Sequence, residues 1–174
     1  MWHVELVEIR PATPADADGV AAVHVRSWQV GYRGLLPVDY LAGLRPEDRA
    51  QRYTFDDPDP TRPATVVAVQ GGTVIGFATT GTCKDHGVGT AGELLALYVD
   101  PPFWGAGTGG ALIAAARQRL LDHGFTEAVL WVLAGNDRAE RFYRSDGWTH
   151  DGSRRHDEVW GINVEELRYK RTLP

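Results

Sequence analysis

Four glycines gather at residues 105–110, directly after an apolar segment and before an alanine-rich one. The apolar segment, 94–99, predicts a buried strand, and the alanine-rich segment predicts a helix over about 108–123. The first N–H groups of a helix lack intrahelical partners, the helix dipole favours negative charge there, and glycine lets a phosphate approach the backbone. This pattern predicts a diphosphate site built from Gly105, Ala106, Gly107, Thr108, Gly109 and Gly110.

Two common nucleotide-binding patterns do not fit this turn. A dinucleotide fingerprint has its glycine turn in the first βα unit and an acidic residue about 20 residues further on. Here the turn lies past the middle of the chain, and the next strand, 128–133, ends in Ala-Gly-Asn. A nucleotide triphosphate loop needs a Lys after its glycines, and none occurs between Lys84 and Lys170. Both nucleotide interpretations are therefore disfavoured.

Glu93 is the only charged residue of an otherwise apolar strand, 93–99. Residues 93, 95, 97 and 99 are expected to share one face, and the strand is expected to be central and covered on both sides. Partial burial would raise the pKa of this carboxyl from about 4.3 toward neutrality, the range useful to a general base. The alternative is a solvated glutamate at the start of a strand.

Two ordered motifs resemble those of the GNAT superfamily of acyl-CoA-dependent N-acetyltransferases. The first is Val99-Asp-Pro followed by Trp104-Gly-Ala-Gly-Thr-Gly, in which Trp104 replaces the family's usual Arg or Gln. The second consists of Asn136, Ala139, Phe142-Tyr143 and Gly147-Trp148. The resemblance covers residues 64–150. The departure at position 104 puts little in doubt, because the family's pyrophosphate contacts come mainly from backbone amides.

The resemblance implies that acetyl-CoA is the co-substrate and that the acceptor is a primary amine of a small molecule or a peptide. It also implies backbone pairing of Leu97, Tyr98 and Val99 with pantetheine. Asn136 would contact pantetheine, and Tyr143, seven residues or about two turns further along the same helix, would sit near the sulfur as the acid. The alternatives are purely structural roles, a helix N-cap for Asn136 and a core aromatic residue for Tyr143.

The resemblance bears on the base and on the acceptor as well. Glu93 has the same offset from the Val-x-Pro valine as the general-base glutamate of the superfamily's histone-acetylating branch. In the family the first two helices wall the acceptor site, so that Trp28, Tyr32 and Tyr40 are candidates for an aromatic amine-binding wall. The alternative is a core aromatic stripe, and His24 is an alternative base.

Composition narrows the function classes. The chain has 174 residues, which suit one domain spanning 1–174. Its 18 basic and 23 acidic residues give a net charge of −5 without blocks of like charge, which argues against nucleic-acid and anionic-membrane binding. No apolar run reaches membrane-span length and no signal peptide is recognised, so a cytoplasmic protein is expected. Family members often dimerise, so a homodimer is possible.

Cysteine and histidine usage bears on the reaction type. Cys83 is the only cysteine and lies in neither motif. We therefore expect no disulfide and no covalent acetyl-enzyme, but direct attack in a ternary complex. The six histidines are scattered without metal-ligand spacing, so no metal is expected.

The remaining sequence predicts an α+β fold with a mixed, mostly antiparallel sheet flanked by helices, in the order β-α-α-β-β-β-α-β-α-β-β. Strands are expected at 4–10, 64–70, 73–82, 93–99, 128–133, 148–155 and 164–170, and helices at 14–29, 38–55 (interrupted near Pro46), 108–123 and 136–145. This is also the order of the family. The main rival is a non-catalytic acyl-CoA-binding or sensor domain on the same fold, although acyl-CoA binding alone requires neither Tyr143 nor Glu93.

Overall fold

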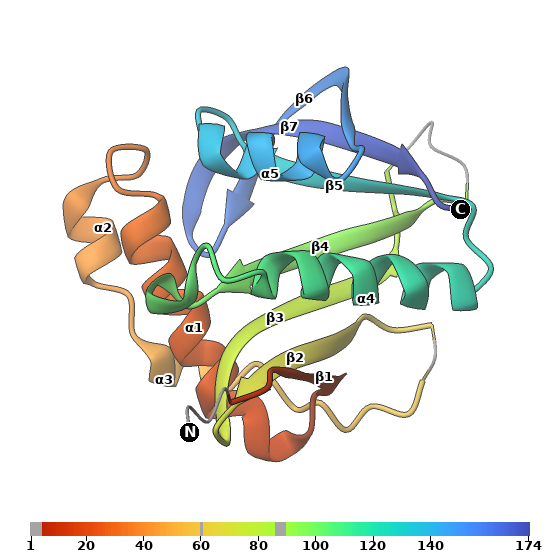
Figure 1. The fold of residues 1–174 in the computed structure, drawn as a ribbon. Helices are drawn as coiled ribbons and strands as arrows, with labels where there is room; N and C mark the ends of the chain where they lie inside the picture. Colours follow the sequence, from red (N-terminus) through yellow and green to blue (C-terminus); the bar gives the residue numbers. More distant parts are fainter. Residues whose placement is uncertain (1–4, 60, 86–89) are drawn as a thin grey trace.

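The computed structural model describes residues 5–59, 61–85 and 90–174. Within them, seven strands form one sheet in the order β1-β2-β3-β4-β5-β7-β6 (Figure 1). The strands are β1 (Glu8–Pro11), β2 (Ala64–Gln70), β3 (Thr73–Thr82), β4 (Gly92–Val99), β5 (Glu127–Leu133), β6 (Thr149–Val159) and β7 (Ile162–Thr172). The helices are η1 (Pro14–Asp16), α1 (Ala17–Gly31), α2 (Val38–Ala42), α3 (Pro46–Ala50), η2 (Pro101–Phe103), α4 (Thr108–Asp122) and α5 (Asp137–Ser145).

The predicted α+β architecture is confirmed. Only β4 and β5 pair in parallel, and the other neighbouring strands pair antiparallel. The β2–β3 hairpin has its predicted bounds, because Gly71 and Gly72 both adopt the positive φ that a tight hairpin turn requires. Residues before Glu5, including the start of the first predicted strand at Val4, lie outside the described residues.

The second predicted helix differs from the structure. The stretch 38–55 contains two short helices, α2 and α3, which end at Ala42 and Ala50. Gly43 caps α2 and Pro46 occupies the first turn of α3, so each helix has its own stop or start signal. Residues 53–59 form no helix. No helix within the described ranges combines the length and the apolar character needed to cross a membrane.

The helices cover both faces of the sheet. Helices α4 and α5 pack on one face around a core that includes Leu112, Ile113 and Trp148. Helix α1 packs on the other face, where Val20 and Val23 contact β2 and β3 residues. Strand β4 lies in the middle of the sheet between these two layers, as predicted for a central strand.

A β-bulge in β4 corrects the predicted face of Glu93. Thr79 of β3 pairs with Ala96 and Thr80 pairs with Leu94, so Leu95 has no partner and the alternation of side chains changes phase there. Leu97 therefore packs with Leu94 on the α4 face. The prediction that 93, 95, 97 and 99 share one face is wrong, and so is full cover on both sides, because Leu95 is 45% exposed.

The bulge also marks the point where β4 leaves β5. Their parallel pairing covers only Gly92 to Leu94, opposite Ala128 to Leu130. Beyond it, β5 continues to pair with β7 along its whole length, whereas β4 bends away with β3. Figure 1 shows β4 and β5 adjacent at one end and diverging toward the other. The divergence leaves part of β4 without a second neighbouring strand, which is where the candidate site lies.

Candidate active site

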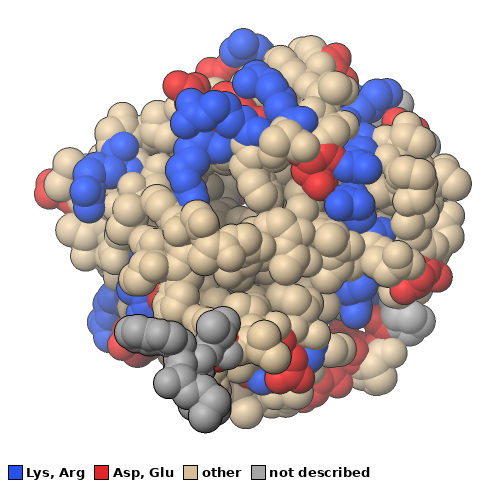
Figure 2. Space-filling view, viewed as in Figure 1, with Lys and Arg blue, Asp and Glu red and all other residues tan. Residues whose placement is uncertain are grey.

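A cleft of about 670 Å³ lies where β4 and β5 diverge. In Figure 2 a hollow is visible between α4 and α5, with Lys and Arg side chains gathered on its α5 side. The lining combines β4, the glycine turn, the end of α1 and one side of α5: Ser27, Val30, Gly31, Tyr32, Leu94, Leu95, Ala96, Leu97, Tyr98, Val99, Trp104, Gly105, Gly109, Trp131, Val132, Asn136, Arg138, Ala139, Phe142 and Tyr143.

The glycine turn is shaped as an anion site requires. Gly105 and Gly107 have φ of +79° and +89°, a region that glycine enters without strain. Gly107 is the N-cap of α4, and the first intrahelical bond runs from Ala111 N to Gly107 O at 3.1 Å. The N–H groups of residues 108–110 therefore have no acceptor within the helix. A Cβ at Gly110 would meet nothing within 4 Å, so the space beside this turn is open. Gly105 and Gly109 line the cleft, whereas Ala106, Gly107, Thr108 and Gly110 adjoin it.

The backbone of β4 points alternately at β3 and at the cleft. Asp100 N donates to Ile75 O, so the Gly76–Val99 pair is of the non-hydrogen-bonded kind and the Phe77–Tyr98 pair is of the hydrogen-bonded kind. Backbone groups of Val99 and Leu97 consequently face the cleft, while those of Tyr98 face β3. Tyr98 presents its side chain to the cleft instead.

Asn136 and Tyr143 both line the cleft from α5, as their seven-residue spacing predicts. Asn136 also caps the helix, because its Oδ1 accepts from Ala139 N at 3.2 Å. The Tyr143 ring packs edge-on against Trp148. Burial raises the pKa of Tyr143, so its phenol keeps its proton at neutral pH. The described residues offer its hydroxyl no hydrogen-bond partner, which leaves the proton available to a ligand.

The three aromatics predicted for the acceptor wall occupy different places. Tyr32 lines the cleft, and its hydroxyl lies 3.3 Å from that of Tyr98. Trp28 is only 3% exposed and packs behind Tyr32 in the core. Tyr40 donates to Trp160 O at 2.6 Å and so ties α2 to the β6–β7 turn. The structure therefore brings one of the three to the cleft.

His24, the alternative base, is buried outside the cleft lining. Its Nδ1 lies 2.8 Å from the Tyr53 hydroxyl, and its ring stacks on Tyr98. Burial, with a smaller effect of Arg49, lowers the pKa of His24 to about 3. Such a weakly basic and enclosed imidazole is a poor candidate for proton abstraction.

Glu93 lies next to Leu94 and Leu95 of the lining but is not itself part of it. Burial, followed by the nearby charge of Asp85, raises the pKa of Glu93 to about 7. A carboxylate with this pKa is half ionised at neutral pH, where it can both accept and return a proton. The predicted elevation is therefore present, while the role of Glu93 as a base remains a prediction.

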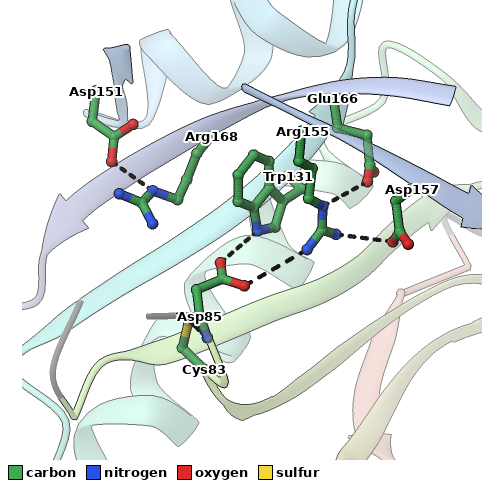
Figure 3. A network of polar contacts seen from close by, with 8 residues as sticks. All are labelled: Cys83, Asp85, Trp131, Asp151, Arg155, Asp157, Glu166 and Arg168. Carbon is green, nitrogen blue, oxygen red and sulfur yellow. Dashed lines mark hydrogen bonds and ion pairs between the residues drawn. The ribbon is translucent and has the colours of Figure 1, made fainter. Parts of the chain in front are cut away.

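A polar network lies around Trp131, one of the residues that line the cleft (Figure 3). The Arg155 guanidinium lies 4.2 Å over the Trp131 ring and contacts three carboxylates, those of Glu166 (3.0 Å), Asp85 (3.7 Å) and Asp157 (3.5 Å). Trp131 Nε1 donates to Asp85 at 2.7 Å. Arg168 lies over the same Trp131 ring and pairs with Asp151 at 2.6 Å. With Glu93, the carboxylates of this network outnumber its two guanidinium groups, although none of them belongs to the cleft lining.

Cys83 lies beside the same network. Its Sγ, an Asp85 oxygen and a Glu93 oxygen lie within 4.8 Å of one another. Burial raises the pKa of Cys83 to about 11, so the group is a thiol and a weak nucleophile at neutral pH. Because Asp85 already accepts from Trp131 and contacts Arg155, the set does not resemble a preformed metal site. His86 and His3 lie outside the described residues.

The lining includes residues to which the sequence assigned no binding role, among them Ser27, Trp104 and Arg138. Ser27 Oγ and Trp104 Nε1 both donate to Val99 O, at 3.0 and 2.7 Å, and so occupy one of the Val99 backbone groups, whose pairing with pantetheine the resemblance implies. Arg138 lies over the Trp104 ring at 3.5 Å from its centroid. Arg138 follows Asn136 by two residues, a spacing that does not place two side chains on one face of a helix, so the sequence contained no local signal for it.

Comparison with known proteins decides the family. Residues 28–148 match the sequence model of the Acetyltransferase (GNAT) family. The chain belongs to this family. The uncharacterized N-acetyltransferase YuaI of Bacillus subtilis (strain 168) is 34% identical over 134 residues, which cover 75% of this chain and 74% of YuaI. GNAT membership makes the chain an N-acetyltransferase and confirms the resemblance drawn from the two motifs.

Solved structures show the same fold. The paiA N-acetyltransferase of Thermoplasma acidophilum, in complex with coenzyme A, aligns with a TM-score of 0.69 at 20% identity over 96% of this chain and 99% of its own. The yncA putative acetyltransferase of Salmonella typhimurium, with acetyl-CoA, aligns with a TM-score of 0.68 at 20% identity over 97% of this chain and 94% of its own. The GNAT fold is therefore shared along nearly the whole chain.

Proposed function

We propose that this GNAT protein transfers the acetyl group of acetyl-CoA to a primary amine of a small molecule or peptide, by direct attack in a ternary complex. The observation that carries the proposal is that one cleft is lined both by the glycine turn and by Tyr143. The surroundings of the cleft differ from one side to the other: free N–H groups of the glycine turn suit a diphosphate, and a carboxylate-rich network behind Trp131, outside the lining, suits a cation.

Glu93 is proposed to remove the proton of the acceptor ammonium, directly or through a water. Its pKa of about 7 keeps a substantial fraction ionised at neutral pH. The neighbouring Asp85 and Glu166 carboxylates favour a cationic acceptor on the same side of the cleft, and Trp131 offers an apolar wall. The resulting neutral amine then attacks the thioester carbonyl, and the C–N bond forms as the C–S bond breaks. In this step the nitrogen releases its second proton and the departing sulfur gains one, so the products are an amide and a free thiol.

Tyr143 is proposed to donate to the departing sulfur. Its raised pKa means that the phenol is less acidic than a free thiol of pKa about 8.5, so complete transfer to a relaxed thiolate would be uphill. A hydrogen bond to the developing negative charge stabilises the transition state without that cost. The proton of the Tyr143 hydroxyl therefore stays hydrogen-bonded between the phenol oxygen and the sulfur while the thiol forms.

Gly110 provides a test of the diphosphate site. Gly110→Asp adds a carboxylate at the third residue of α4, where a Cβ meets nothing within 4 Å. An acidic side chain in the first turn interacts favourably with the helix dipole, so the midpoint temperature of thermal unfolding should not fall. Repulsion of the diphosphate should weaken acetyl-CoA binding roughly tenfold or more, as measured by calorimetry.

The neutral variant Gly110→Asn is the matched control, because it adds the same volume without charge. Gly107 is a poorer probe, since any side chain there is strained by the positive φ. Equal acetyl-CoA affinity of Gly110→Asp and Gly110→Asn would place the diphosphate elsewhere.

A further inference from the structure

Arg138 has an unusual position in the cleft. Among the described residues of the lining, it is the only one with a charged side chain. It lies two residues after Asn136, at the start of α5, and shares the lining with Gly105 and Gly109 of the glycine turn. The only full charge in the lining therefore accompanies the turn whose N–H groups suit an anion.

No carboxylate neutralises Arg138 within the described ranges. Other arginines of α4 and α5 form salt bridges, such as Arg117 with Asp146 and Arg144 with Glu140. The Arg138 guanidinium instead lies on the Trp104 ring, 3.5 Å from its centroid, and burial lowers the pKa of Arg138 from its usual value. A guanidinium remains charged in proteins, so Arg138 is a partly desolvated cation whose hydrogen-bond donors are free for a ligand.

Trp104 holds this cation in place. Its Nε1 donates to Val99 O at 2.7 Å, which fixes the ring to the end of β4. The far edge of the ring reaches α1, where a Cβ on Gly31 would lie 3.9 Å from it. An indole is the best aromatic partner for a cation, and stacking limits the rotamers of the long arginine side chain. The platform thus orients Arg138 before any ligand arrives.

We propose that Arg138, oriented by Trp104, binds the diphosphate of acetyl-CoA together with the N–H groups of the glycine turn. The planar guanidinium matches two phosphate oxygens at once, which a backbone amide cannot do. Arg138 is the binding group and Trp104 is a positioning residue. This inference rests on the proposed use of acetyl-CoA and adds a side-chain anchor to it.

Calorimetry with acetyl-CoA, with its 3′-dephospho form and with S-acetylpantetheine, which lacks both the diphosphate and the adenosine 3′-phosphate, tests the assignment. Arg138→Gln should weaken acetyl-CoA binding roughly 10- to 100-fold, the range for hydrogen bonds to charged groups. The loss expected for acetyl-CoA should be the same for the 3′-dephospho form, which keeps the diphosphate, and a loss confined to acetyl-CoA would place Arg138 at the 3′-phosphate and overturn the inference. Affinity for S-acetylpantetheine should not change. Trp104→Leu should weaken acetyl-CoA binding by a smaller factor, because it removes the platform but keeps the charge. The salt dependence of binding should decrease in Arg138→Gln.

Arg141→Gln is the matched control, since Arg141 lies one turn further along α5 and outside the cleft lining. Its affinity for all three compounds should equal that of the wild type. Wild-type affinity of Arg138→Gln for acetyl-CoA would overturn the inference, and so would an equal loss of S-acetylpantetheine binding. A wild-type protein that binds S-acetylpantetheine no more weakly than acetyl-CoA would exclude any diphosphate anchor. Failure of the wild type to bind any of the three compounds would instead overturn the proposed function.

Discussion

Replacement of Tyr143 by Phe is expected to lower kcat by roughly 10²-fold or more, the usual contribution of a positioned acid. The substitution removes one oxygen and its proton and preserves the ring that packs against Phe142 and Trp148. Folding and acetyl-CoA affinity should therefore change little, because the described residues give the hydroxyl no partner to lose. Steady-state kinetics of thiol release, together with a thermal melt, measure both effects.

Tyr53→Phe is a suitable control for the loss of a tyrosine hydroxyl, because Tyr53 bonds His24 away from the cleft. Its kcat should stay near that of the wild type, even if its melting temperature falls. A Tyr143→Phe enzyme with unchanged kcat would make Tyr143 a structural aromatic and would assign the sulfur's proton to solvent.

Glu93→Gln is expected to lower the neutral-pH rate by about 10²-fold and to abolish the acidic limb of the kcat/KM profile. In the wild type, activity should rise as the pH passes through about 7, where Glu93 loses its proton. Glutamine keeps the shape and can still hydrogen-bond, but it cannot accept the proton. Profiles measured with two amines of different basicity show which group causes the acidic limb. A limb caused by ionisation of the substrate would shift with the pKa of the amine, whereas a limb caused by Glu93 would not.

A limb that follows the amine and is unaffected by Glu93→Gln would make Glu93 an ordinary strand carboxylate.

The pH dependence of the free energy of unfolding tests the raised pKa of Glu93 independently of catalysis. A folded pKa above the unfolded value of 4.5 stabilises the protein fully below pH 4.5, and this contribution is lost as the pH rises through about 7. Glu93→Gln should therefore gain stability relative to the wild type across that interval, as measured by denaturant unfolding.

The elements of the fold could be predicted where local signals were strong. The Gly71-Gly72 turn between two β-branched segments determined the β2–β3 hairpin, and the glycine turn determined the start of α4. The bulge at Leu95 could not be predicted, because it depends on how β4 pairs with β3, and both alternatives have similar apolar faces. The divergence of β4 from β5, and hence the cleft, follows from that pairing.

The candidate site was predictable to the extent that its residues share one helix or one turn. Asn136 and Tyr143 line the cleft together because helical spacing places them on one face. Trp28 and Tyr32 have similar spacing, but α1 ends at Gly31, and the chain after it directs Tyr32 to the cleft while Trp28 packs in the core. The contact of Arg138 with Trp104 joins two motifs distant in sequence, so no local pattern contained it.

The most direct test of acetyl transfer is an incubation of the protein with acetyl-CoA and a panel of diamines, aminoglycosides, amino acids and peptides with free N-termini. Thiol release and acetylated products are measured together by a colorimetric thiol assay and mass spectrometry. The account predicts thiol release that depends on one class of amine, an equal amount of N-acetylated product, and no acetylated form of the protein itself. Tight acetyl-CoA binding without amine-dependent thiol release would contradict it and would indicate a non-catalytic acyl-CoA-binding domain.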